Sequence, residues 1–252
     1  EKAAKLKKKV IGAMIYPAVV ITIAVGIVSM IMIFVIPKFE QIFSDFNTEL
    51  PGITKLLLAI SYWFANEYGW AYVLCTPIVF ALLVRLLKLS EGGRYFVDAA
   101  KLKVPILGGI LSKTAIARFT RTLATLISAG VPILDAINIT KDTCGNEVYA
   151  RALAKVHDAI REGESMADPL RATKTCDAIV VNMIDVGEET GDLDKMLITI
   201  ADKYDNAVDV MVGSLISILE PVMVVILGVI VGFIVIALFA PMVSLIQSVS
   251  GS

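Results

Sequence analysis

His157 is the single histidine of the 252-residue chain and the residue with which a proton-transferring site would begin. It lies in the segment KVHDAIREG, at a polar position of an amphipathic helical pattern, where we expect solvent exposure. A membrane-anchored hydrolase that combines this histidine with a serine and an aspartate is one alternative function. A lone histidine excludes an HExxH zinc site, and we assign no catalytic residue, no metal and no cofactor.

Acidic side chains gather in a second segment, GEETGDLD, which contains Glu188 and Glu189. Their oxygens could hold a cation such as calcium, although the spacing is not that of an EF-hand loop. The other interpretation is a structured turn whose acids favour the N-terminus of the next helix. In that turn Gly187 and Gly191 would adopt unusual backbone angles, and Thr190 or Asp192 would cap the helix that follows. The sequence leaves both interpretations open.

The composition indicates a membrane protein that does not bind nucleic acid. Hydrophobic residues make up 57% of the chain and charged residues 19%, and the mean hydropathy is +0.78. The net charge of −1 offers no excess of positive charge for a nucleic-acid backbone. Three cysteines without a CxxC pair are expected to be small core residues in a reducing compartment: Cys75, Cys144 and Cys176.

Three long apolar runs predict transmembrane helices at residues 10–36, 69–87 and 212–246. Lysine and arginine gather before the first run and after the second, which places those flanks in the cytoplasm. The cytoplasmic parts are then the end of a helix (1–9) and a helical domain (88–211), and the periplasmic parts are a connection (37–68) and a tail (247–252). The N-terminus is therefore expected in the cytoplasm and the C-terminus in the periplasm.

Prolines bracket two of these runs at the same spacing. Pro17 and Pro37 are 20 residues apart, as are Pro221 and Pro241, and each pair encloses an apolar run. Each proline is expected to end or kink a helix at a membrane boundary, and the matched spacing indicates a duplicated unit. Prolines are also common near span ends, which is the simpler explanation. If the unit is duplicated, we expect a first cytoplasmic domain that this chain lacks.

Between the second and third runs the periodicity is helical throughout. Helices are predicted over residues 112–129, 132–143, 146–161, 165–171 and 177–187, and a sixth from Asp192 that continues into the third run. Gly130 suits the left-handed position that ends the first of them, and Pro132 suits the start of the next. No segment alternates with a period of two. The predicted fold is an all-α membrane protein with three transmembrane helices and a cytoplasmic six-helix bundle.

Charge is unevenly distributed within this bundle. Six basic residues and one acid, Asp98, lie between Arg94 and Arg121, whereas nine acids and two lysines lie between Asp177 and Asp209. Helix faces of opposite charge attract each other, so they favour contact either within one subunit or across subunits. Two separately solvated helix faces are the alternative.

The third run carries two further candidates. Glu220 stands before Pro221 among apolar neighbours, where a carboxylate is costly to leave unpaired, so this position could be a hinge with a partner. An interfacial carboxylate in contact with water is the alternative. Gly228 and Gly232 form a GxxxG pair that could admit a closely packed helix, although glycine is frequent in membrane spans.

Three strings in order carry a family resemblance: ARFTRTLATLISAGVPILDAI, VGEETGDLDKML and LEPVMVVILGVIVGFIVIALFAPM. A second copy of the proline-bracketed run, YP…P, lies at Tyr16 to Pro37. With these motifs the chain closely resembles the inner-membrane platform proteins of type IV pilus and type II secretion machines. The resemblance covers essentially the whole chain except for the first cytoplasmic domain of that family.

The resemblance implies a non-enzymatic platform in the bacterial inner membrane that couples an assembly ATPase to pilin or pseudopilin subunits. The implied partners are a cytoplasmic hexameric ATPase, those subunits, other inner-membrane assembly proteins, the lipid bilayer and a second copy in a dimer. The chain has no GxxxxGK[ST] loop, in agreement with energy supplied by a partner. A small transporter or channel is the leading alternative, although its only ionisable candidates, Arg85 and Glu220, lie near span ends.

Overall fold

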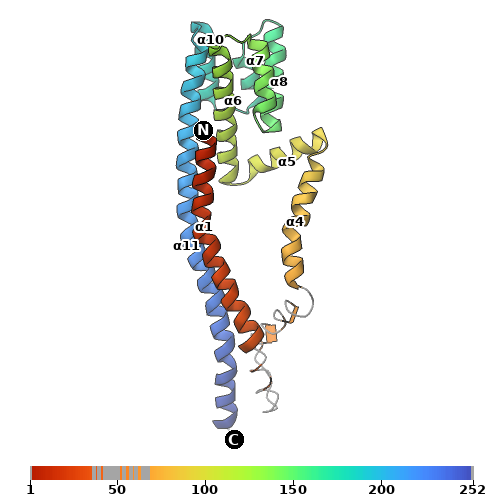
Figure 1. Ribbon diagram of the computed structural model, residues 1–252, viewed down its shortest axis with the longest axis vertical. Coiled ribbons are helices and arrows are strands. Elements are labelled where there is room, and N and C mark those ends of the chain that lie inside the picture. The colour runs from red at the N-terminus through yellow and green to blue at the C-terminus, as the bar shows by residue number, and fades with distance from the viewer. Residues whose placement is uncertain are drawn as a thin grey trace. The chain divides into compact units, whose positions relative to one another are not determined.

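The computed structural model describes residues 2–35 and 69–250, with isolated residues between 38 and 63 (Figure 1). The chain divides into two compact units. One unit, Leu82–Leu215, is called the bundle unit here; the other combines Glu1–Ala81 with Ile216–Ser252 and is called the apolar unit. Two of the described helices, α4 and α11, run from one unit into the other.

Long apolar helices form the described part of the apolar unit. They are α1 (Lys2–Met30), which continues as the π-helical turn η1 (Ile31–Val35), with α4 (Gly69–Leu87) and α11 (Leu193–Ser250). Among the described residues, one helix is long and apolar enough to cross a membrane, over Leu193–Ala237, and Ile15–Met30 and Cys75–Leu87 are shorter apolar helices. The spans expected at 10–36 and 69–87 stay predictions.

The sequence predicted that each of these prolines would end or kink a helix at a membrane boundary. In the described residues, none of them ends a helix. Pro17 lies inside α1, and α11 continues through both Pro221 and Pro241. A proline removes one backbone hydrogen bond, but the bonds on either side of it hold the helix in a long apolar segment. Pro37 lies outside the described residues.

The bundle unit is all-helical in its described residues. Its helices are α5 (Glu91–Lys103), α6 (Leu107–Ser128), α7 (Ile133–Thr143), α8 (Glu147–Arg161), α9 (Ala167–Thr173), α10 (Ala178–Thr190) and the start of α11. The sequence predicted the six from α6 onward, and α5 is an addition.

Local residues explain most of the helix ends. Gly130 has a φ of 80° directly after α6 and its C-cap Ala129, and Pro132 precedes the first residue of α7. The side chain of Asn146 accepts a hydrogen bond from the Val148 N–H at the start of α8, as an N-cap does. The sequence predicted the roles of Gly130 and Pro132, whereas for α8 it predicted a start near residue 146 without identifying Asn146 as the cap.

The core of the bundle unit packs around α6. Side chains that are less than 2% exposed come from most of its helices: Ile116, Leu123, Ile137, Leu153, Met166, Leu170, Ile184 and Leu197. Phe119 belongs to the same cluster, and its ring centroid lies 6.3 Å from that of Tyr149 on α8. The buried hydroxyls of Thr120 and Thr140 donate to carbonyls one turn earlier, so neither is left unsatisfied.

One cysteine differs from the expectation of three core residues. Cys144 is buried and Cys176 is half-buried, but Cys75 is exposed on the apolar helix α4. Burial raises the pKa of the Cys144 thiol and raises the pKa of Cys176 to about 12. Both thiols are therefore protonated and unreactive in the folded protein.

Candidate functional site

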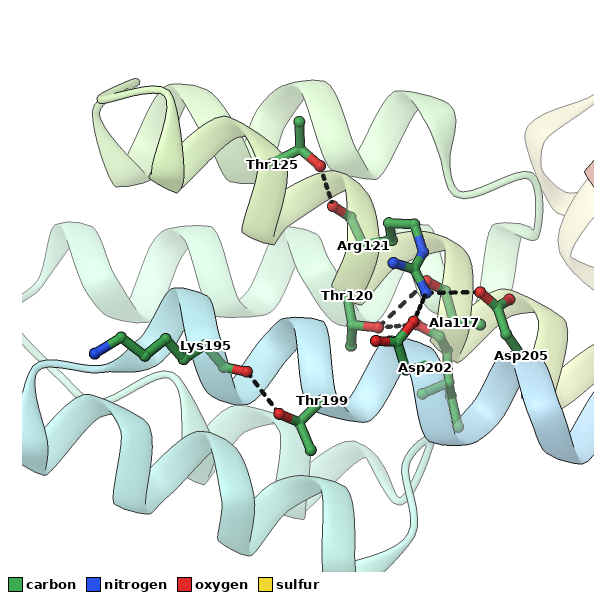
Figure 2. A network of polar contacts seen from close by, with 9 residues as sticks. Ala117, Thr120, Arg121, Thr125, Lys195, Thr199, Asp202 and Asp205 are labelled. Atoms are coloured by element: carbon green, nitrogen blue, oxygen red, sulfur yellow. Dashed lines mark hydrogen bonds and ion pairs between the residues drawn. The ribbon is translucent and has the colours of Figure 1, made fainter. Parts of the chain in front are cut away.

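A guanidinium on α6 bridges two carboxylates on α11. Arg121 Nη2 donates to Asp202 Oδ1 and to Asp205 Oδ2, each at 2.7 Å (Figure 2). Residues three apart lie on one face of a helix, so both aspartates reach the same arginine. These three residues are called the Arg121 junction.

The environment of the junction favours the charged state of its arginine. The hydrogen bond to Asp202 raises the pKa of Arg121, burial works against that rise, and the bond to Asp205 adds to it. Figure 2 shows the junction beside the buried hydroxyl of Thr120, where α6 passes α11. The side chain of Arg121 is 37% exposed, so water screens the junction only in part.

Other polar contacts attach the first turns of α11 to the bundle. Tyr204 on α11 donates its hydroxyl to Asp177 Oδ2 at 2.7 Å, and Lys113 Nζ lies 5.1 Å from the centroid of the Tyr204 ring. Burial raises the pKa of Tyr204, and the hydrogen bond to the Asp177 carboxylate raises it further. Ser128 on α6 also donates to Asp194 at 3.2 Å.

These contacts decide between the two interpretations of the uneven charge. Arg121 and Lys113 lie in the basic segment, and their partners lie on the acidic helix of the same chain. The unlike faces are therefore joined within one subunit, and the alternative of two separately solvated faces is wrong for α6 and α11.

The acidic turn stabilises the bundle through one of its glutamates. The Met166 N–H donates to both carboxylate oxygens of Glu188, at 3.1 and 2.9 Å, and Met166 is the residue that precedes α9. A carboxylate in this position satisfies a free N–H group of a helix start and interacts favourably with the helix dipole. Glu189, by contrast, is exposed on α10.

The structure corrects two expectations for this turn. Gly187 lies inside α10, which continues to Thr190 rather than ending at Gly187. Gly187 allows α11 to pass close to α10, because an added Cβ would lie 3.1 Å from the Cα of Leu193 and from Met196 Cβ. It does not have the unusual backbone angle that the sequence predicted. Gly191 does have a left-handed conformation, with a φ of 77°.

The polar groups of the turn have partners within the protein. The hydroxyl of Thr190 donates to the carbonyl of Val186, so Thr190 does not cap α11, and the carboxylate of Asp192 pairs with Lys195. Across the described part of the chain, no group of three or more His, Cys, Asp or Glu residues could hold a metal ion.

The remaining candidates lie in the apolar unit on α11. Glu220 is exposed and has no hydrogen bond or ion pair with the part of the chain that the structure describes. Added Cβ atoms at Gly228 and Gly232 would meet nothing within 4 Å. A partner for Glu220 and a helix packed on the two glycines stay predictions.

Sequence reasoning missed a cluster around Asp98 on α5. This carboxylate is 6% exposed and accepts hydrogen bonds from Lys88 at 2.9 Å, from Lys101 at 3.4 Å and from the Glu147 N–H at 3.2 Å. Burial alone would raise the pKa of Asp98, but the bonds from Lys88 and the Glu147 N–H lower it below its usual value. The signal in the sequence was that Asp98 is the single acid of a basic segment.

No catalytic arrangement accompanies the single histidine in the described residues. His157 is half-buried on α8, and its Nδ1 lies 3.3 Å from the carboxylate of the adjacent Asp158. The polar side chains that the structure brings together join helices of the bundle to one another.

Comparisons with known proteins identify relatives of this chain. A family model described as type II secretion system (T2SS), protein F, matches residues 119–241. The type IV pilus assembly protein PilC of Myxococcus xanthus is 43% identical over 245 residues, which cover 97% of this chain and 58% of that protein.

Two further relatives match at similar coverage. The PilC protein of Thermus thermophilus is 38% identical over 99% of this chain and 61% of its own length. The type II secretion system protein F of Pseudomonas aeruginosa is 30% identical over 99% of this chain and 61% of its own length. The chain therefore spans about three fifths of the length of these relatives.

Proposed function

The chain belongs to the family of inner-membrane proteins that contains type II secretion system protein F and type IV pilus assembly protein PilC, and from this membership we propose a platform function. The platform carries out no reaction of its own. It couples a cytoplasmic assembly ATPase to the assembly of pilin or pseudopilin subunits at the membrane.

The continuity of α11 is the observation that carries this proposal. The helix runs without interruption from Leu193 to Ser250. Its first turns are attached to the bundle unit by the Arg121 junction and by Tyr204, and the helix then becomes apolar enough to cross a bilayer. A continuous helix with one end held in a packed domain carries a displacement of that domain into the membrane.

The proposed topology follows from the distribution of basic residues. The bundle unit lies in the cytoplasm, where the hexameric ATPase acts, the N-terminus lies on the same side, and the C-terminus lies in the periplasm. Pilin or pseudopilin subunits, other inner-membrane assembly proteins and a second copy of the chain meet the helices in the bilayer.

A break in α11 tests the proposal directly. We would insert a short glycine-serine segment after Gly213, between the bundle contacts and the apolar part of the helix, in the protein as the cell makes it. The matched control carries the same insertion after Gly163, where the chain has already left α8 with a φ of 87°.

The readouts are abundance in the inner membrane and the number of pili or pseudopili per cell. We expect normal abundance for both variants, and loss of assembly only for the insertion after Gly213. Full assembly by that variant would show that α11 does not transmit the motion.

A further inference from the structure

The outer face of α5 is apolar although the helix belongs to the bundle unit. This face consists of Gly92, Phe96, Ala99, Ala100 and Lys103, which recur at helical spacing and of which Ala99 alone is half-buried. The Phe96 side chain is 70% exposed. A helix that faced water on this side would be expected to carry several polar residues there.

The opposite face of α5 points into the protein and buries Val97 and Asp98. Asp98 is buried there between Lys88 and Lys101, and it accepts a hydrogen bond from the first N–H of α8. Arg151 on α8 packs on the ring of Tyr95 at 4.5 Å and donates to the carbonyl of Glu91. These contacts determine the rotation of α5, so the outward direction of Phe96 is imposed by the fold.

The connection between α5 and α6 extends the exposed apolar surface. Val104 is 42% exposed, Ile106 is 55% exposed and Leu107 is 51% exposed. Ile106 has a φ of 66°, a conformation that is costly for a β-branched residue. Leu89, which precedes α5, is 74% exposed. The strained isoleucine is therefore held with its side chain outside the core.

Chain continuity and charge indicate what covers this surface. Only Lys88, Leu89 and Ser90 separate α5 from the end of the apolar helix α4. Lys103 lies on the same face of α5 as Phe96, is exposed and has no ion pair with a described residue. An exposed basic side chain beside exposed large apolar ones matches the headgroups and the upper acyl region of an anionic bilayer.

We propose that α5 and the connection Val104–Leu107 form an interfacial element that lies on the cytoplasmic surface of the bilayer. Phe96, Ile106 and Leu107 insert among the lipids, while Lys103 contacts anionic headgroups. The buried Asp98 cluster transfers this anchorage to α8 and so to the bundle. This inference rests on the proposed function in one respect, because it requires α4 to span the membrane.

Depth-dependent quenching of a fluorophore tests the contact with lipid. The full chain, with Cys75 replaced by serine, receives one cysteine by Phe96→Cys or Ile106→Cys and is labelled with a nitrobenzoxadiazole fluorophore in nanodiscs of phosphatidylcholine and phosphatidylglycerol. Lys155→Cys, on the exposed side of α8, is the matched control, and the chain without an added cysteine gives the labelling background. Leu83→Cys on α4 reports whether that helix is in the bilayer.

We expect lipids with a spin label near the headgroup to quench the fluorophore at positions 96 and 106 at least roughly twofold more than at position 155. Equal quenching at positions 96 and 155, with quenching at position 83 by deeply labelled lipids, would overturn the interfacial element and leave the membrane topology intact. Protection from water at position 96 without quenching would mean that a protein covers the face, and would also overturn it. Absence of quenching at position 83 would reject the topology together with the inference.

Discussion

Replacing Arg121 with alanine removes two charged hydrogen bonds that attach α11 to α6. Both hydrogen bonds of the junction use the same guanidinium nitrogen, so one substitution breaks both. It also leaves Asp202 and Asp205 on one face of α11 without the positive charge between them. Like charges at this spacing destabilise a helix, so we expect the variant to lose the attachment and to gain a repulsion.

The magnitude follows from the exposure of the three side chains. Asp202 is 51% exposed, which places its pair with Arg121 among surface ion pairs of about 0.5 kcal/mol. Asp205 is 25% exposed, so its bond is given the typical net value of a partly exposed hydrogen bond, about 1 kcal/mol. The expected loss of about 1.5 kcal/mol lowers Tm by about 6 °C for a unit of this size.

Thermal unfolding in nanodiscs can be followed with a thiol-reactive dye. The buried Cys144 is 3% exposed and becomes reactive when the bundle unfolds, provided that the exposed Cys75 is first replaced by serine. Lys155→Ala on α8 is the control for loss of a surface charge, and its Tm should change by less than about 1 °C. A Tm for Arg121→Ala equal to that of the control would refute the attachment.

Three further predictions concern the same stability; the first two use the thiol-reactive dye, and the third uses circular dichroism because protonated thiols do not react at acidic pH. Glu188→Ala removes the acceptor of the Met166 N–H and should cost about 1 kcal/mol, whereas the exposed Glu189→Ala should be nearly neutral; equal effects of the two would contradict the capping role. Gly191→Val forces a β-branched residue to a φ of 77° and should cost about 1–2 kcal/mol, and an unchanged Tm would show that the turn relaxes without cost. The lowered pKa of Asp98 stabilises the fold above the unfolded-state pKa of about 3.9, and this stabilisation is lost as the pH falls through the lower folded-state pKa. Asp98→Asn should therefore lower Tm at pH 7 and reduce its fall on acidification, and a parallel fall in both proteins would contradict this assignment.

Helix boundaries were predicted from the sequence where the signal is local. Gly130 follows α6 in a left-handed conformation, as predicted, because one backbone angle decides where that helix ends. The end of α10 was misplaced for the opposite reason. Gly187 was interpreted as a helix end, but it is glycine because α11 passes within contact distance of it, which local sequence does not record.

Helix α5 escaped prediction because two of its residues depart from the usual pattern. The sequence rules expect apolar residues inside and charged ones outside, whereas α5 buries Asp98 beside Val97 and exposes Phe96. The charge is compensated by Lys88 and Lys101, which lie close to it along the chain, and by the Glu147 N–H, which does not. The tertiary contact with α8 was needed to show which way the helix faces.

The sequence by itself determined the class of the protein, because hydropathy, helical periodicity and charge sign are properties of short segments that hold wherever the chain folds. It also indicated that a basic segment and an acidic segment could attract each other, with two separately solvated faces as the alternative. It could not select the partners, since Lys113, Arg118 and Arg121 are equivalent positive charges on one helix. Only the packing of α6 against α11 brought Arg121 within 2.7 Å of two aspartates more than 80 residues away, because a hydrogen bond requires a distance that periodicity alone does not specify.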